Sequence, residues 1–363
     1  MMRLLKQIKT AVFPLLILLI TACNLPTELD DAIITPESTA VVEATATAVP
    51  PGYTRSNPLP GHISHTIANW EVEILDSVRG EKAYHAVLAA NQFNDPPPDG
   101  WEYLLVRYRV RSLYAGEDKE SLGLHVSGDG NVLHYSFNSS AVSPDPMLET
   151  YLPGGAESEG WEAYLIQIGE ENLIVMVDDV SNYEEPEQYI ALAEGNRVTV
   201  NEELLNSITP TLVGTDPSEP APVGLVITTE DWQLSILELY SGEGAWNRII
   251  EANQFNDPPQ EGLVYILVKM RLRYIGLEES GELVHLHSDL FTLIDNDGNR
   301  YDVPSIVEPE PELDGRLFPG GTLEGWMVLQ APESIIPESR LLFKPRTNSV
   351  DNLRYLSLGD YGR

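Results

Sequence analysis

The sequence predicts an all-β fold of two tandem β-sandwiches, each with a short helical insert, on three observations. The octapeptide Ala-Asn-Gln-Phe-Asn-Asp-Pro-Pro occurs twice, at residues 90–97 and 252–259. Short segments around each copy alternate between apolar and polar residues, with the period of two that is typical of strands. Gly, Pro, Asn and Asp separate these segments, as in sandwiches of roughly 100–150 residues. We call residues 61–206 repeat 1 and residues 225–363 repeat 2.

The predicted strands are clearest at two places in each repeat. Residues 70–74 and 232–236 each place a tryptophan and two aliphatic side chains on one face. Residues 103–111 and 265–273 place four apolar side chains on one face, which predicts sheets with one side on the core and the other in water. The opposite face of these longer strands carries a basic stripe: Arg107, Arg109 and Arg111 in repeat 1, and Lys269, Arg271 and Arg273 in repeat 2.

This basic stripe is the candidate binding face of a chain whose formal net charge is −34. Two explanations stay open. The cations could pair across strands with the abundant Asp and Glu, each pair stabilising the sheet by ~0.2–1 kcal/mol. Alternatively, they could form a site for an anionic polymer or a peptide carboxylate. The acidic balance argues against nucleic acid as a partner, because a phosphate backbone requires clustered cations.

A short helical segment precedes each octapeptide, at residues 81–89 and 244–251. The first asparagine is expected to end the helix in the left-handed conformation, since Pro-Pro prevents continuation. The phenylalanine is expected to pack on the core, and the helix to close one end of the sandwich. The alternative is that Asn and Asp oxygens bind Ca²⁺. The repeated residues in question are Asn91, Phe93, Asn94 and Asp95, with Asn253, Phe255, Asn256 and Asp257.

Further features recur in the same order. An Asp-Gly hairpin signal occurs at residues 128–131 and 296–299, and the larger offset there places a six-residue insertion in repeat 2. A Pro-Gly-Gly turn then precedes Gly-Trp in both repeats. With the Trp-led strand and the helical insert, this series resembles the telokin-like, immunoglobulin-like domains of unknown function found in bacterial lipoproteins. The resemblance covers about residues 62–200 and 225–358, and it implies two immunoglobulin-like sandwiches outside the cytoplasm.

The N-terminus is expected to anchor the protein to a membrane. Residues 1–22 carry three cations before an apolar stretch too short to span a bilayer, as in a signal peptide. They end in Ile-Thr-Ala before Cys23, the only cysteine. This resembles the lipobox of bacterial lipoproteins, which implies cleavage before Cys23 and acylation of its sulfur and new amino group. We therefore expect attachment to the lipid bilayer through Cys23, on the extracytoplasmic side.

Two segments are expected to connect the parts of the chain. Residues 23–60 are rich in Thr, Ala and Pro and are predicted to be a flexible tether. Residues 207–224 contain four prolines and are predicted to be a linker between the repeats.

The sequence contains one candidate catalytic site. The sequence has no Gly-x-Ser-x-Gly elbow and no Gly-rich phosphate loop. His285 and His287 would share one face of a strand, and together with Asp289 they could bind a metal ion. The alternative prediction is therefore a metal-dependent hydrolase that uses these three residues. This pair has no counterpart in repeat 1. We therefore predict a non-enzymatic surface lipoprotein without a cofactor. It would either bind an envelope protein or polymer or serve as a structural module of the envelope. In the binding case, the two copies would make weak contacts bivalent.

Overall fold

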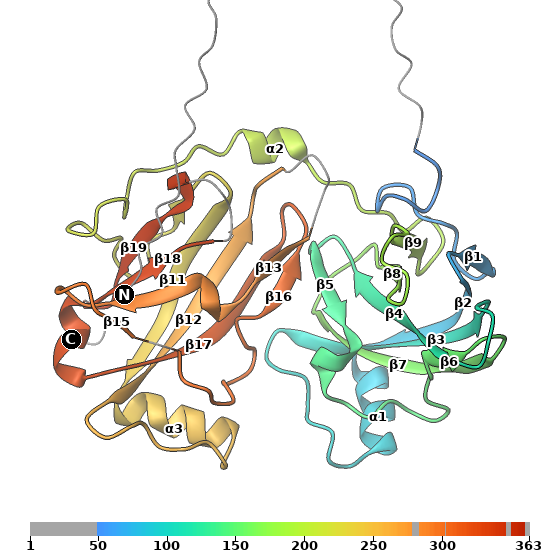
Figure 1. Ribbon diagram of the computed structural model, residues 1–363, viewed down its shortest axis with the longest axis horizontal. Coiled ribbons are helices and arrows are strands. Elements are labelled where there is room, and N and C mark those ends of the chain that lie inside the picture. The colour runs from blue at the N-terminus through green and yellow to red at the C-terminus, as the bar shows by residue number, and fades with distance from the viewer. Residues whose placement is uncertain (1–48, 278–282, 302, 346–349, 360–363) are drawn as a thin grey trace, which may run out of the picture. The chain divides into compact units, whose positions relative to one another are not determined.

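The computed structural model describes residues 49–277, 283–301, 303–345 and 350–359 (Figure 1). The predicted signal peptide, Cys23 and most of the predicted tether lie outside these residues. Residues 48–363 form one compact unit that contains both repeats. Among the described residues, no helix is both long enough and apolar enough to cross a membrane.

Antiparallel sheets dominate the described chain, and the prediction of an all-β fold is confirmed. The first sheet of repeat 1 has the strand order β1-β2-β3-β7, and β4, β5, β6, β8 and β9 form its second sheet. The elements are β1 (His65–Ile67), β2 (Trp70–Arg79), α1 (Glu81–Ala90), β3 (Trp101–Ser112), β4 (Lys119–Ser127), β5 (Val132–Tyr135), η1 (Ser136–Ser139), β6 (Tyr151–Pro153), β7 (Glu157–Gln167), β8 (Ile174–Asp179) and β9 (Gln188–Ala191).

Repeat 2 has a first sheet of order β10-β11-β12-β17 and a sheet of order β15-β14-β18-β19. After α2 (Glu202–Asn206), the elements are β10 (Ile227–Thr228), β11 (Trp232–Ser241), α3 (Glu243–Ala252), β12 (Val264–Tyr274), β13 (Val284–Leu286), η2 (Ser288–Leu290), β14 (Phe291–Ile294), β15 (Arg300–Tyr301), β16 (Gly315–Leu317), β17 (Thr322–Ala331), η3 (Glu333–Glu338), β18 (Arg340–Phe343), η4 (Val350–Asn352) and β19 (Arg354–Ser357).

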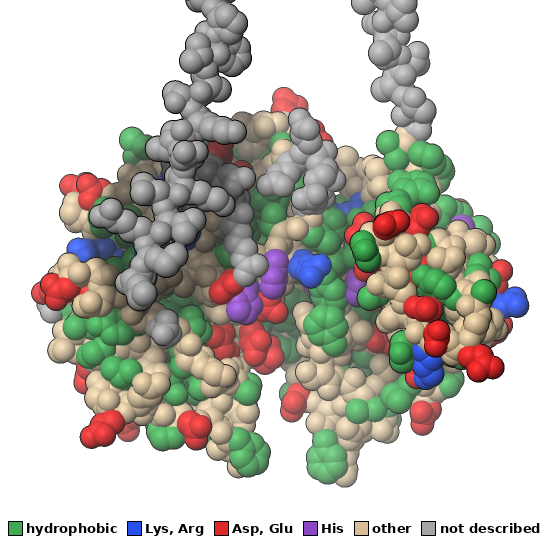
Figure 2. Space-filling model, in the orientation of Figure 1, with side chains coloured by type: hydrophobic (Ala, Val, Ile, Leu, Met, Phe, Trp, Pro, Cys, Tyr) green, Lys and Arg blue, Asp and Glu red, His purple; other side chains and the backbone are tan. Residues whose placement is uncertain are grey.

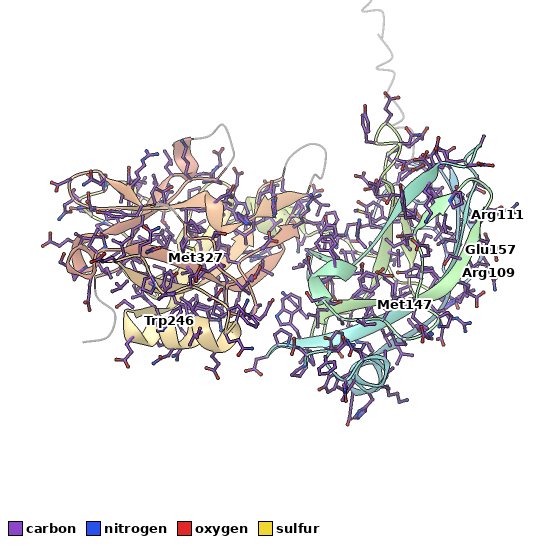
Figure 3. All side chains as sticks on the ribbon, turned by 60° about the horizontal axis from the view of Figure 1, so that its bottom comes forward. Arg109, Arg111, Met147, Glu157, Trp246 and Met327 are labelled. Carbon is purple, nitrogen blue, oxygen red and sulfur yellow. The ribbon has the colours of Figure 1, made fainter. Side chains whose placement is uncertain are left out.

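The first sheets of the two repeats share their register. β2 pairs with β3 with a bulge between Ile74 and Asp76, and β11 pairs with β12 with a bulge between Ile236 and Glu238. The inward faces hold the core, where Trp70 is fully buried. Met327 occupies the core of repeat 2 (Figure 3). The alternation predicted for these strands is therefore observed in both repeats.

Each helix packs on part of the outer face of a first sheet. Ala83 and Val87 of α1 pack on Tyr103 and Leu105 of β3, and α3 packs on β12 in the same way. The expectation that the helix closes one end of the sandwich is therefore wrong, because β3 has apolar residues on both faces under α1. The basic stripe begins on β3 where α1 no longer covers it.

The second sheets differ between the repeats. The start of β4 pairs with β6, and the rest of β4 pairs with β8 and β5. In repeat 2, two separate strands take the place of β4. β13 pairs with β16, whereas β14 pairs with β15 and β18. η2 separates β13 from β14, where the sequence predicts the six-residue insertion.

One sheet is shared by both repeats. β5 of repeat 1 pairs with β16 of repeat 2, with Leu133 opposite Arg316 and Val132 opposite Leu317. The resulting strand order is β13-β16-β5-β4-β8-β9. An unpaired strand edge exposes a row of backbone donors and acceptors. In this protein, each repeat covers such an edge of the other.

Both predicted connecting segments pack on the repeats where they are described. The backbone N–H of Leu59 donates to the Tyr189 carbonyl at 2.8 Å, and Arg55 is 8% exposed. In the linker, the N–H of Ala221 donates to the Tyr355 carbonyl of β19 at 2.8 Å. Packed structure thus begins before the predicted boundary at residue 61.

Candidate functional site

The basic stripe of repeat 1 is paired with glutamates on both neighbouring strands. Arg109 contacts Glu73 of β2 and Glu159 of β7, each at 2.8 Å between nitrogen and oxygen. Arg107 also contacts Glu159, at 2.6 Å. The hydrogen bond from Arg109 lowers the pKa of Glu159. Arg109, Arg111 and Glu157 lie together at the outer face of the sheet (Figure 3). Arg111 lies 3.6 Å from Glu71.

The stripe of repeat 2 has fewer carboxylates. Arg271 contacts Glu324 at 2.5 Å, and Lys269 lies 3.7 Å from Glu238. Arg273 donates to the Gly320 carbonyl at 3.4 Å. Cross-strand pairing therefore accounts for five of the six stripe cations, with the sixth on a backbone carbonyl.

The two histidines of the alternative prediction have separate partners. His285 of β13 contacts Asp314 at 2.7 Å, and the Nδ1 of His287 accepts from the backbone N–H of Asp289 at 3.1 Å. Their ring centroids are 5.6 Å apart. Within the described parts of the chain, no three His, Cys, Asp or Glu side chains are grouped so that they could hold a metal ion.

The octapeptide asparagines hold the loop after each helix. The Asn94 amide nitrogen donates to the carbonyls of Val87 (2.8 Å) and Val142 (3.0 Å), and its oxygen accepts from the Val142 N–H at 2.9 Å. Asn256 makes the equivalent three bonds to Ile249 and Val307. In both repeats the asparagine oxygen accepts a backbone hydrogen bond that holds the loop.

The first asparagine and the aspartate of the octapeptide also have backbone roles. The side chain of Asn91 accepts from the N–H of Phe93 at 3.1 Å, an Asx turn that repeat 2 reproduces at Asn253. Asn91 is extended, with φ −149°, so the predicted left-handed cap is wrong. The hydroxyl of Tyr103 donates to the Asp95 carbonyl at 3.0 Å, and Tyr265 does the same to Asp257.

The octapeptide phenylalanines do not pack on the core, which corrects the prediction. Phe93 is 81% exposed and Phe255 is 83% exposed. Asn94 and Asn256 already close the loop with their hydrogen bonds, so the rings are turned outward. The neighbouring Val142 and Val307 are also exposed. In the view of Figure 1, α1 and α3 both lie at the lower edge, where Figure 2 shows hydrophobic side chains in both repeats.

A buried arginine joins the two repeats. Arg55, from the predicted tether, donates to the Asn131 side chain at 2.9 Å and to the Gly128 carbonyl at 2.6 Å. Its guanidinium lies 3.8 Å from the ring centroid of Phe318 in repeat 2. The N–H of Phe318 in turn donates to the Asn131 carbonyl at 2.9 Å. This contact holds the hairpin turn of repeat 1 against the turn after β16.

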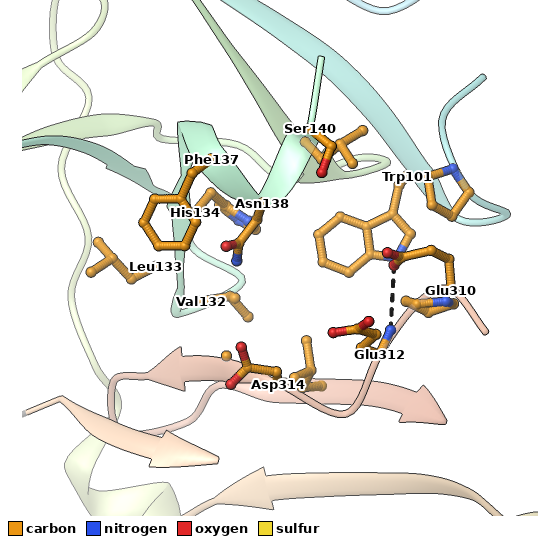
Figure 4. Close-up of a pocket in the computed structure, with 15 residues that line it drawn as sticks. Trp101, Val132, Leu133, His134, Phe137, Asn138, Ser140, Glu310, Glu312 and Asp314 are labelled. Atoms are coloured by element: carbon orange, nitrogen blue, oxygen red, sulfur yellow. Dashed lines mark hydrogen bonds between the residues drawn. The ribbon is translucent and has the colours of Figure 1, made fainter. Parts of the chain in front are cut away.

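The junction also contains a cavity of about 250 Å³ with walls from both repeats (Figure 4). Repeat 1 contributes Trp101 and Phe137, and repeat 2 contributes the acidic segment before β16. His134 lines the cavity, and its Nε2 lies 2.7 Å from Glu170, with both side chains almost fully buried. Burial opposes ionisation of Glu170, but His134 and backbone donors lower its pKa overall.

The acidic segment of the cavity places a carboxylate at every second residue: Glu308, Glu310, Glu312 and Asp314. Burial raises the pKa of Glu308 to about 7. Burial also raises the pKa of Glu310 and of Glu312, and for Glu312 the neighbouring carboxylates add to the effect. Neighbouring carboxylates repel each other when they are deprotonated, so this wall favours positive charge.

The acidic segment has a counterpart in repeat 1 that can be recognised in the sequence. Residues 143–148 read Ser-Pro-Asp-Pro-Met-Leu and residues 308–313 read Glu-Pro-Glu-Pro-Glu-Leu. Each segment forms a parallel bridge to the tryptophan of the Gly-Trp motif, from Met147 to Trp161 and from Glu312 to Trp326. The repeated Pro-acid-Pro spacing would have located the segment. Its position at the junction depends on the pairing of β5 with β16.

Comparisons with known proteins give partial structural likenesses. No family model matches the chain, and no curated protein matches it. The yjhA protein of Bacillus subtilis is similar over 38% of this chain and 98% of its own, with 11% identity and a TM-score of 0.29. The ycdA protein of Bacillus subtilis strain 168 covers 38% of this chain and 39% of its own, with 12% identity and a TM-score of 0.29. A conserved hypothetical protein from Bacillus anthracis covers 38% and 95%, with 14% identity and a TM-score of 0.23. Likenesses this weak transfer no function to this chain.

Proposed function

We propose that this chain is a lipid-anchored, extracytoplasmic binding protein without enzymatic activity, and that it engages its partner through two Phe loops, residues 91–95 and 253–257. One observation carries the proposal. Phe93 and Phe255 hold the same position in the two repeats and are almost equally exposed, at 81% and 83%. Cys23 and its lipobox supply the anchor in this proposal.

The surroundings of the Phe loops indicate the chemistry of the partner. Val142 and Val307, whose backbones are hydrogen-bonded to Asn94 and Asn256, are 42% and 48% exposed. Asp95 lies in the first loop and Asp99 follows it, and Asp257 lies in the second loop and Glu261 follows it. Aromatic anchors supply much of the binding energy at protein interfaces, and charges around them select the partner. A protein with apolar sockets bordered by Lys or Arg fits both loops.

A single Phe loop is too small for a stable complex. An aromatic side chain buries about 150–250 Å², whereas a standard interface buries about 800 Å² per partner. Because one chain carries both loops, they would bind a partner more tightly together than either loop would alone. Once the first loop is bound, the second contact forms at a high effective concentration. This extends the predicted bivalence from the basic stripe to the Phe loops.

The test is capture of an envelope partner by the full chain. Phe93→Ala and Phe255→Ala are each expected to weaken capture about 10-fold or more, and the double variant to lose it. Tyr183→Ala is the matched control, since Tyr183 is an aromatic residue 88% exposed outside the loops, and it should bind normally. Photocrosslinking from positions 93 and 255 should label the same partner.

The basic stripe provides the competing binding face. Arg109→Ala with Arg271→Ala should leave capture unchanged, because most stripe cations are paired with carboxylates. Loss of capture in that variant, with normal capture by the double Phe variant, would assign binding to the stripe. The anchor is tested separately by palmitate labelling, and a Cys23→Ala chain that still takes up label contradicts it.

A further inference from the structure

We infer that the cavity between the repeats is a binding site for an organic cation, of the type of a primary ammonium on a short apolar stem. This site shares no lining residue with the Phe loops and does not depend on the proposed function. The inference rests on the aromatic wall, on the carboxylates opposite it and on a buried imidazole at the cavity.

The aromatic wall comes from repeat 1. Trp101 and Phe137 line the cavity, and Phe137 is 71% exposed. Aromatic faces attract organic cations, with estimates of about 0.5–2 kcal/mol per contact. Indole and phenyl rings do not ligate metal ions. The wall therefore favours an organic cation over a bare divalent metal ion.

The opposite wall carries the countercharge. Glu310, Glu312 and Asp314 line the cavity, and none of its described lining residues is Lys or Arg. Asp314 is already in contact with His285. The carboxylate of Glu310 accepts from the N–H of Glu312 at 3.4 Å (Figure 4). Glu310 and Glu312 thus provide the negative charge for an ammonium group placed between them and Trp101.

His134 provides an observation independent of the acidic wall. Its side chain is 2% exposed, and the ring packs edge-on against Trp101 with centroids 5.8 Å apart. The contact of its Nε2 with Glu170 holds the ring in this position, beside the Trp101 indole that lines the cavity.

The size of the cavity limits the ligand. A volume of about 250 Å³ lies just below the range of ordinary ligand sites. An amino-acid side chain or a small amine fits it, and a folded polymer does not. The ligand could therefore be a free amine or a lysine side chain of a partner. Both present the same ammonium group.

The experiment measures binding of n-butylammonium to the full chain in detergent. The readouts are calorimetry and the ¹⁹F resonance of 5-fluorotryptophan at Trp101, assigned by its loss in Trp101→Phe. We expect saturable binding that shifts this resonance, and at least ~10-fold weaker binding of n-butanol, the neutral isostere. Equal binding of the two compounds would overturn the inference, and this comparison needs no variant.

Variants then locate the site. Glu312→Gln and Trp101→Ala should each weaken n-butylammonium binding about 10-fold, whereas Trp101→Phe should largely retain it. Glu149→Gln is the matched control, because Glu149 holds the position of Asp314 in the acidic segment of repeat 1, away from the cavity. Unchanged binding in Glu312→Gln and Trp101→Ala overturns the assignment. Ca²⁺ binding that Glu312→Gln abolishes, without any n-butylammonium binding, overturns it in favour of a metal. Free lysine and a lysine peptide, compared last, identify the natural source.

Discussion

The outer faces of the two first sheets carry similar cations in different surroundings. Arg109 of repeat 1 lies directly between Glu73 and Glu159 in the strand register. Arg271, its counterpart, lies between Ser235 and Glu324. By contrast, the asparagine that holds the loop after the helix makes the same hydrogen bonds in both repeats. Side chains that satisfy the backbone have stayed the same, and surface charges have diverged.

The largest expected effect concerns a glycine shared by both repeats. A Cβ on Gly325 would lie 2.3 Å from the Glu312 carbonyl, and one on Gly160 would lie 2.4 Å from the backbone at Met147. Gly160→Ala and Gly325→Ala should each destabilise the protein by about 2–3 kcal/mol, since the segment packed against each glycine must move. Chemical denaturation measures this. A tolerated alanine in one repeat only would show that the two bridges are not equivalent.

The next effect tests the octapeptide asparagines. Asn94→Ala removes three hydrogen bonds to the backbone of Val87 and Val142 and should cost about 1–3 kcal/mol, and Asn256→Ala should cost about the same. Asn94→Asp keeps the acceptor and loses the donor, so it should fall between wild type and alanine. Hydrogen exchange at Val142 and Val307 reports the local effect. Unequal costs would break the equivalence of the two loops.

A pH-dependent effect on stability is expected from Glu308 of repeat 2. Glu308 has its pKa raised to about 7 by burial, whereas repeat 1 has Ser143 at that position. Between pH 5 and 7 the folded state keeps a proton that the unfolded state releases, so stability falls as pH rises. Glu308→Gln should remove roughly 1–2 kcal/mol of this decline. Parallel pH–stability curves for variant and wild type would contradict the assignment.

The smallest effect concerns the stripe. Arg109→Ala breaks contacts to three glutamates and Arg271→Ala breaks contacts to one, so the first should lower the melting temperature more. Both shifts should shrink at high salt, because these pairs are exposed to solvent. Equal shifts in the two variants would indicate that the additional glutamates in repeat 1 contribute nothing.

The predictable part of the fold followed from local pattern. Alternation in residues 103–111 identified the buried face of β3, because side chains in a strand point to opposite sides. The same pattern failed at Tyr103 and Leu105, which α1 covers on the outer face. The prediction that Phe93 packs on the core was also wrong. A large apolar residue beside a helix end usually packs inward, but here the hydrogen bonds of Asn94 hold the loop.

By itself, the sequence determined the all-β class, the register of the two repeats and the strands that bury the core, since these depend on periodicity along the chain. Only the tertiary structure decided that β5 pairs with β16, that Arg55 of the predicted tether is buried at the junction, and that Trp101 faces Glu312 across a cavity. The physical reason is that edge pairing and cavity walls join residues far apart in sequence, and no local pattern records which edges meet.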